Sequence, residues 1–119
     1  MKSVLRTMLL AGVMAISLAV VNGEAQAEPM VSSYYGYELA GSPTASGVPF
    51  DPEGMTAAHK TLPFGTVLLV TYGGNSVEVV VNDRGPYVDG RDLDLSQGAA
   101  EAIGLTAAGS GVVDVQIVD

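Results

Sequence analysis

Alternation of apolar and polar residues predicts a β-hairpin in the middle of the chain. In residues 76–82, three valines at every second position alternate with Glu78 and Val80, which is the pattern of a half-buried strand. The β-branched run 66–72 precedes it, and Gly73-Gly74-Asn75 lies between the two runs. Glycine pairs of this kind are typical of tight hairpin turns, so we expect the two runs to pair as antiparallel strands.

Three further segments have the composition or periodicity of strands. Residues 31–37 are rich in Tyr and Val, and residues 112–118 alternate apolar and polar positions. Residues 92–95 alternate acid and Leu, so that Asp92 and Asp94 are expected to project from one face of a short strand. The chain therefore contains at least five short strands.

Helical segments are few and short. Ser96 is a good N-cap for a helix that runs to about Ile103 and is closed by Gly104. Residues 55–60 are expected to form one or two helical turns, and the Gly- and Pro-rich stretch 40–52 is expected to be a long ordered loop. Short strands joined by Gly-rich turns, with one or two short helices, indicate a mainly β sandwich or small barrel.

The N-terminus has the layout of a secretory signal peptide. Lys2 and Arg6 precede an apolar run of 14 residues, and an Ala-Gln-Ala cleavage pattern ends at residue 27. A membrane-spanning helix needs about 20 apolar residues, which favours cleavage over anchoring. We expect a signal peptide (1–27) followed by a single exported domain (28–119). With no cysteine for lipid attachment, that domain should keep no stable membrane anchor.

Charge and composition limit the possible partners of the expected domain. Residues 28–119 hold three cations against twelve acids, a formal charge of −9, so nucleic acid is a poor partner. The three cations, Lys60, Arg84 and Arg91, all fall in the middle third of the chain. They are either ordinary members of surface ion pairs or a small positive patch on an acidic protein.

A histidine and an aspartate are the best candidates for chemistry. His59 is the only histidine and lies between a Gly/Pro-rich loop and a strand, while Asp83 ends the 76–82 strand. An imidazole and a carboxylate together can perform general acid–base catalysis. Without cysteine there is no thiol nucleophile or Cys-ligated zinc site, and the acids of 89–94 depart from calcium-loop spacing. The sequence predicts no metal and no cofactor.

Four motifs follow one another along residues 33–118: YYGYELAGSPTASG, TAAHKTLPFGT, VVVNDRGPY and DLDLSQGAAEAIGL. In this order they resemble the rare lipoprotein A (RlpA-like) family. The resemblance implies a small six-stranded double-psi β-barrel with a substrate groove, in a bacterial protein exported to the periplasm or the cell wall. It also implies a lytic transglycosylase that cleaves the MurNAc-β-1,4-GlcNAc bond of peptide-free peptidoglycan strands and forms 1,6-anhydro ends.

By their positions in the motifs, Asp83 takes the acid/base role of this family and His59 its functional histidine. The family commonly reads T-A-S-G-E where this chain has Val48, so one implicated carboxylate is missing. A guanidinium could bind the lactyl carboxylate of muramic acid, and a tyrosine could stack on a sugar. We expect the substrate-binding residues to be Thr44, Ser46, Asn82, Arg84, Tyr35 and Arg91.

Three functions remain open at this stage. The first is the transglycosylase, which would act as a monomer on glycan strands without a further targeting domain. The second is a non-catalytic, expansin-like module that binds the cell wall, which the valine at position 48 would suit. The third is a secreted inhibitor or interaction domain that uses the barrel as a scaffold, since a fold alone does not determine function.

Overall fold

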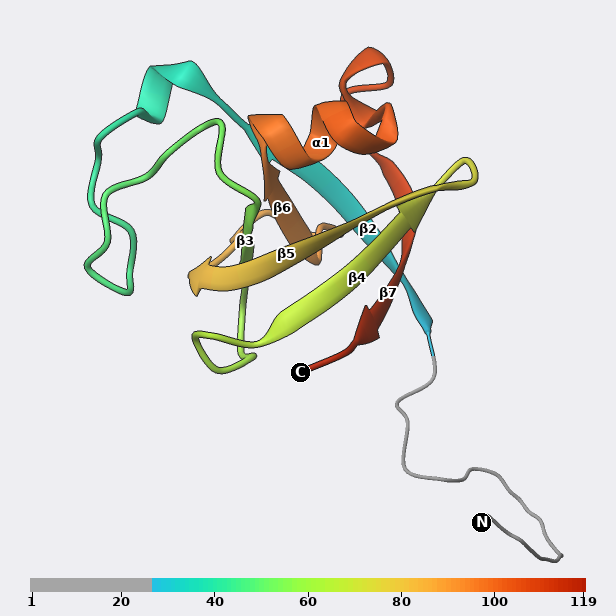
Figure 1. Cartoon of the computed structure of the whole chain (residues 1–119), viewed down its shortest axis with the longest axis horizontal. Coiled ribbons are helices and arrows are strands. Elements are labelled where there is room, and N and C mark those ends of the chain that lie inside the picture. The colour runs from blue at the N-terminus through green and yellow to red at the C-terminus, as the bar shows by residue number, and fades with distance from the viewer. Residues whose placement is uncertain (1–26) are drawn as a thin grey trace, which may run out of the picture.

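Six strands close into a barrel in the computed structural model, which describes residues 27–119 (Figure 1). Apart from Ala27, the predicted signal peptide lies outside the described residues and stays a prediction. The strands are β2 (Glu28–Tyr35), β3 (Thr56–His59), β4 (Val67–Tyr72), β5 (Asn75–Asp83), β6 (Leu93–Ser96) and β7 (Gly111–Ile117). One α-helix, α1 (Gln97–Ile103), and two 3₁₀ turns, Tyr37–Leu39 and Leu105–Ala107, complete the described elements.

The order of strands around the barrel is β2-β6-β3-β5-β4-β7. β2 pairs with β6 and β3 pairs with β5 in parallel, while the other four pairings are antiparallel. Because β3 and β5 are parallel, their C-terminal ends meet at the same rim of the barrel. The start of β6 joins them there, since β6 is antiparallel to β3 and His59 faces Leu93. The expectation of a mainly β, six-stranded barrel is confirmed.

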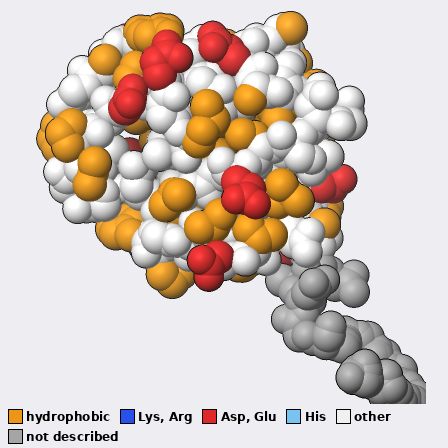
Figure 2. All heavy atoms as spheres, viewed as in Figure 1, with side chains coloured by type: hydrophobic (Ala, Val, Ile, Leu, Met, Phe, Trp, Pro, Cys, Tyr) orange, Lys and Arg blue, Asp and Glu red, His pale blue; other side chains and the backbone are white. Residues whose placement is uncertain are grey.

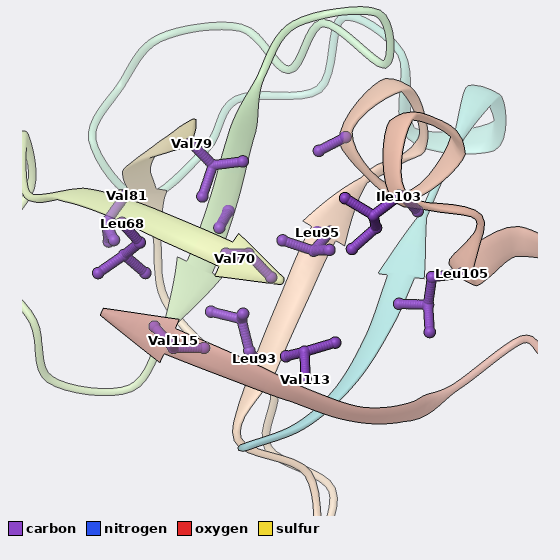
Figure 3. Close-up of a cluster of buried hydrophobic side chains, with 13 residues drawn as sticks. Leu68, Val70, Val79, Val81, Leu93, Leu95, Ile103, Leu105, Val113 and Val115 are labelled. Atoms are coloured by element: carbon purple, nitrogen blue, oxygen red, sulfur yellow. The ribbon is translucent and has the colours of Figure 1, made fainter. Parts of the chain in front are cut away.

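Alternation along the strands builds the core. In β5, Val79 and Val81 are fully buried, whereas Val80 between them is 40% exposed. The helix α1 adds Ala99, Ala100 and Ile103 to the same cluster. Figure 3 shows that side chains from several strands and from α1 converge inside the barrel. A filled interior means that any substrate must bind on the outside of the barrel or at its rim.

Several local predictions are confirmed. Gly73 and Gly74, both with positive φ, form the two-residue turn between the paired residues Tyr72 and Asn75. The hydroxyl of Ser96 accepts a hydrogen bond from the amide of Ala99, and Gly104 ends α1 in the left-handed conformation with φ of 80°. The stretch 40–52 contains no helix or strand, as expected for a loop, and hydrogen bonds from Phe50 to Ser42 and from Gly41 to Phe50 join its two sides. These features depend on neighbours in sequence, which explains why the sequence predicts them.

The predicted helical turns at 55–60 are wrong, because Thr56–His59 forms the strand β3. This strand lies between β6 and β5 and pairs with both, so its backbone groups are satisfied on two sides. Ala57 and Ala58 are 0% and 3% exposed. Alanine favours helix when isolated, but backbone pairing with a strand on each side overrides that preference. No helix among the described residues is long and apolar enough to cross a membrane.

Candidate active site

The rim where β3 and β5 end brings together the two residues predicted to carry chemistry. Ala58 faces Asp83 across the parallel pair, after a bulge that follows Ala57. His59 is the next residue and the last of β3, while Asp83 is the last of β5. Two adjacent parallel strands therefore deliver an imidazole and a carboxylate to the same rim, both half-buried. The 23 residues between them in the sequence form β4, the rest of β5, the turn that joins them and the approach to β4.

The carboxylate of Asp83 is held in a fixed orientation. Its Oδ1 accepts hydrogen bonds from the backbone amides of Ala45 and Arg84, each at 2.8 Å. Within residues 27–119, its Oδ2 accepts a single long hydrogen bond, from the hydroxyl of Tyr35 at 3.4 Å. Charge-assisted bonds to backbone amides are strong and directional, so Oδ1 acts as the anchor. Oδ2 is the oxygen available to a ligand.

The loop 42–50 lies against this carboxylate as a small hairpin. The Thr44 amide donates to the carbonyl of Val48 at 3.0 Å, and the Ser46 amide donates to the carbonyl of Asn82 at 3.2 Å. The Thr44 hydroxyl donates to the same Val48 carbonyl at 2.7 Å and lies 2.9 Å from the Ser46 hydroxyl. The two hydroxyls predicted to bind substrate therefore bond within the loop and fix its shape. Val48 is 55% exposed at its tip.

Tyr35 connects the end of β2 to the carboxylate. Its ring stacks on Phe50 with centroids 4.5 Å apart, which fixes the ring while the hydroxyl reaches Asp83. Burial, followed by the negative charges of Asp83 and Asp94, raises the pKa of Tyr35 well above its ordinary value of 10.0. The hydroxyl therefore stays protonated and acts as a hydrogen-bond donor at all physiological pH values.

The imidazole of His59 has a defined tautomer. Its Nδ1 accepts from the amides of Thr61 and Leu62, both at 3.1 Å, which leaves the proton on Nε2. Burial, and then the positive charge of Arg84, lowers the pKa of His59 below 6.5. The ring is thus neutral at pH 7, with an Nε2–H group as its free donor.

The three cations of the described residues gather at the same rim. The guanidinium of Arg84 lies over the ring of Phe64, 4.0 Å from its centroid, and donates to the carbonyl of His59 at 3.3 Å. The ammonium of Lys60 donates to the carbonyl of Arg91 at 2.6 Å. Arg91 therefore lies beside Lys60, and within residues 27–119 it makes no hydrogen bond to Asp83. The Nε of Arg91 and the Oδ1 of Asn82 are buried and have no hydrogen-bond partner among residues 27–119.

Sequence reasoning missed Asp94 as a member of this region. Asp94 is in register with Ala58 on one side and with Ser33 on the other, and the Ser33 hydroxyl donates to its carboxylate. Because Ala58 also faces Asp83, the two acids lie two strands apart in one row, about 10 Å between their Cα atoms. The negative charges of both acids act on the Tyr35 hydroxyl. Only the strand register reveals this, since the Leu-Asp-Leu alternation looks like an ordinary strand surface.

Metal ligands are not grouped in this structure. Within residues 27–119, there is no cluster of three or more His, Cys, Asp or Glu side chains that could hold a metal ion. The chemistry available at the rim is that of a fixed carboxylate, a protonated tyrosine, a neutral imidazole and nearby cations. Such a set can exchange protons with a neutral or anionic ligand.

The fold and this rim define a small double-psi β-barrel domain. Family comparison agrees: the model of the lytic transglycolase family matches residues 28–117, and the chain belongs to this family. A protein of Nostoc sp. described as a probable endolytic peptidoglycan transglycosylase RlpA is 53% identical over 91 residues, which are 73% of this chain and 24% of that protein. An endolytic peptidoglycan transglycosylase RlpA of Campylobacter jejuni is 43% identical over 90 residues, which are 74% of this chain and 33% of that protein.

This chain thus spans about a quarter to a third of the length of these curated relatives. Among solved structures, the Streptomyces papain inhibitor superposes with a TM-score of 0.66 at 24% identity, covering 82% of this chain and 98% of the inhibitor. The expansin of Clavibacter michiganensis superposes with a TM-score of 0.65 at 23% identity, covering 79% of this chain and 51% of the expansin. At these identities the two structures establish the barrel fold and nothing further.

Proposed function

We propose that this domain is a peptidoglycan lytic transglycosylase, which cleaves the MurNAc-β-1,4-GlcNAc bond of peptide-free glycan strands. Family membership and the descriptions of its relatives support this reaction class. The observation that carries the proposal is the hydrogen bonding of the two carboxylate oxygens of Asp83. Two backbone amides fix its Oδ1, and its Oδ2 is left without a backbone donor at the rim of the barrel.

One carboxyl group suffices for this reaction. In its protonated form Asp83 donates a proton to the oxygen that leaves with GlcNAc, as the bond from that oxygen to C1 of MurNAc breaks. The 6-hydroxyl of the same MurNAc then attacks C1, and the Asp83 carboxylate removes the hydroxyl proton. The product is a 1,6-anhydro ring, no water is consumed, and the carboxyl group is again protonated. Ordinary glycosidases need a second carboxylate because water or the enzyme is their nucleophile.

Neighbouring groups position this carboxyl group and the sugar. The Tyr35 hydroxyl, held protonated, donates to Oδ2 when Asp83 is ionised. The neutral imidazole of His59 offers its Nε2–H to a sugar oxygen, since its Nδ1 is already occupied by two backbone amides. Thr44 and Ser46 contribute through the shape of the loop that anchors Asp83 rather than through free hydroxyl groups.

A second function is favoured by one observation. Val48 is 55% exposed at the tip of the loop, where the resemblance to the family implies a glutamate. A valine neither titrates nor accepts hydrogen bonds there, so the barrel could bind a glycan strand without cutting it. This alternative predicts glycan binding with no 1,6-anhydro product.

Export to the periplasm or the cell wall follows from the proposed substrate, because peptidoglycan lies outside the cytoplasmic membrane. The predicted signal peptide agrees with this location. We further propose that the exported domain acts as a monomer. N-terminal sequencing of the exported protein should begin at Glu28, and sedimentation should give the mass of one chain.

Digestion of purified, peptide-free glycan strands by the exported protein tests the proposal. Mass spectrometry should find 1,6-anhydro-MurNAc ends with the native protein and none with Asp83→Asn. A matched control, Asp114→Asn, removes an exposed carboxylate from β7 and should leave the products unchanged. Glycan binding without products in the native protein would reject the transglycosylase and support the binding module. Neither binding nor products would reject both.

A further inference from the structure

We propose that Lys60 and Arg84 form an anion subsite beside the candidate active site, and that it binds the lactyl carboxylate of N-acetylmuramic acid. The inference rests on the proposed function and adds to it the group by which the barrel would distinguish its substrate. MurNAc differs from GlcNAc only in the 3-O-lactyl ether. That ether ends in a free carboxylate only when the stem peptide has been removed, because the peptide converts the carboxylate to an amide.

The placement of charge is the first support. Residues 28–119 contain three cations and twelve acids. Lys60 directly follows β3, Arg84 directly follows β5, and Arg91 precedes β6 by one residue. Because these three strand ends share one rim, all three cations lie there. Figure 2 shows a different face, with acids among apolar side chains and no Lys or Arg.

The contacts of the two cations are the second support. Arg84 donates to the carbonyls of His59 and Asp83 and stacks on Phe64, while Lys60 donates to the carbonyl of Arg91. Carbonyl oxygens and an aromatic face orient a cation without neutralising its charge. A guanidinium that lies over a ring face keeps N–H donors in its own plane that the ring does not contact, and such an edge fits a carboxylate.

The electrostatic field at His59 is consistent with a positive site. Burial is the largest cause that lowers the pKa of this ring; the charges of Arg84 and Lys60 also lower it, and the charges of Asp92 and Glu28 oppose them. Asp92 is itself engaged, since its Oδ2 accepts from the Val31 amide at 2.9 Å. Within residues 27–119, Arg84 and Lys60 contact backbone carbonyls and the Phe64 ring, so a carboxylate that approaches His59 would meet two cations that are not paired with a carboxylate of this part of the chain.

The test compares two forms of the same glycan strands. One form is peptide-free, and in the other the lactyl carboxylates are converted to neutral methylamides by carbodiimide and methylamine. Affinities are measured by calorimetry with exported protein carrying Asp83→Asn, so that the strands stay intact. With Lys60 and Arg84 present, methylamidation should weaken binding about three- to tenfold, as expected for partly exposed charge pairs.

Variants assign that difference to the two cations. Lys60→Gln and Arg84→Gln should each reduce the ratio of the two affinities, and the double variant should bring it to about 1. Arg84→Lys keeps the charge but loses the planar edge, so it should keep part of the ratio. Ser110→Asp makes the same change in net charge as either Gln variant at an exposed position remote in sequence from the rim, and should leave the ratio unchanged.

Three results would overturn the subsite. One is equal binding of the two strand forms by the protein with both cations. Another is an unchanged ratio in the double variant. The third is that the variants lose the same affinity for both strand forms, which would mean that Arg84 only stabilises the turn after β5. In each case 1,6-anhydro products from the native protein would leave the proposed function standing, whereas the absence of both binding and products would reject the two together.

Discussion

Replacing Asp83 should affect stability as well as activity, and the two effects can be separated. Asp83→Ala removes the acceptor of two backbone amides, those of Ala45 and Arg84, at 2.8 Å. Hydrogen bonds to a charged group contribute about 1.5–3 kcal/mol each, and the Ala45 bond is exposed and so belongs at or below the lower end. We expect Asp83→Ala to lower the free energy of unfolding by about 2–3 kcal/mol.

Asp83→Asn should be milder, because the amide oxygen can still accept from both backbone amides and only the charge is lost. Neutral hydrogen bonds contribute about 0.5–1.5 kcal/mol, so the expected loss is about 1 kcal/mol. Both variants should lack 1,6-anhydro products. Activity loss in the folded Asp83→Asn protein would therefore report on chemistry, whereas Asp83→Ala also releases the loop 42–50.

Urea denaturation followed by circular dichroism measures both losses, with the dependence on urea concentration expected to stay unchanged. Asp83→Ala within about 0.5 kcal/mol of the native protein would refute the reasoning, since Oδ1 would then not anchor the loop. Equal losses in the two variants would also refute it, because the amide oxygen would then retain nothing of the anchor.

Four further predictions follow from the same contacts. The pKa of His59 in the folded protein lies below its unfolded value of 6.5, so the unfolded chain takes up the proton first. The free energy of unfolding should therefore fall as the pH drops through about 6.5 towards the folded pKa. The urea midpoints at pH 8 and pH 5 should differ less in His59→Gln than in the native protein. Asp83→Asn should lower the pKa of Tyr35 towards 10.0, measured by ultraviolet titration, because burial, the largest cause of the raised pKa, remains but the larger of the two charge effects is removed. Val48→Glu should raise the rate of 1,6-anhydro product formation in a glycan digest if a second carboxylate assists the reaction; an unchanged rate would show that Asp83 works alone. Ser96→Ala should lower the free energy of unfolding by about 2–3 kcal/mol, because the buried hydroxyl caps α1 and donates to the Gly54 carbonyl at 2.5 Å. A loss below about 0.5 kcal/mol, measured by urea denaturation, would contradict this prediction.

Local features of this fold were predictable because their causes lie within a few residues. The turn at Gly73-Gly74 needs positive φ at both positions, and only glycine adopts this without cost. The cap at Ser96 needs a hydroxyl three residues before a free amide. The valines of β5 that point into the barrel were predictable because successive side chains of a strand point to opposite faces. In contrast, the strand β3 was predicted as helix, because its state depends on two partner strands that lie 20 or more residues away.

The candidate site divides in the same way. The sequence by itself determined which residue types are available within residues 28–119: one histidine, an aspartate at a strand end, three cations, and a valine at position 48. Motif resemblance then determined the family. Only the tertiary structure decided that Oδ1 of Asp83 anchors the loop through Ala45, and that Asp94 shares its row. Those contacts span 11 to 38 residues, and the physical reason is strand register, which is set by the closure of the whole barrel and not by any segment alone.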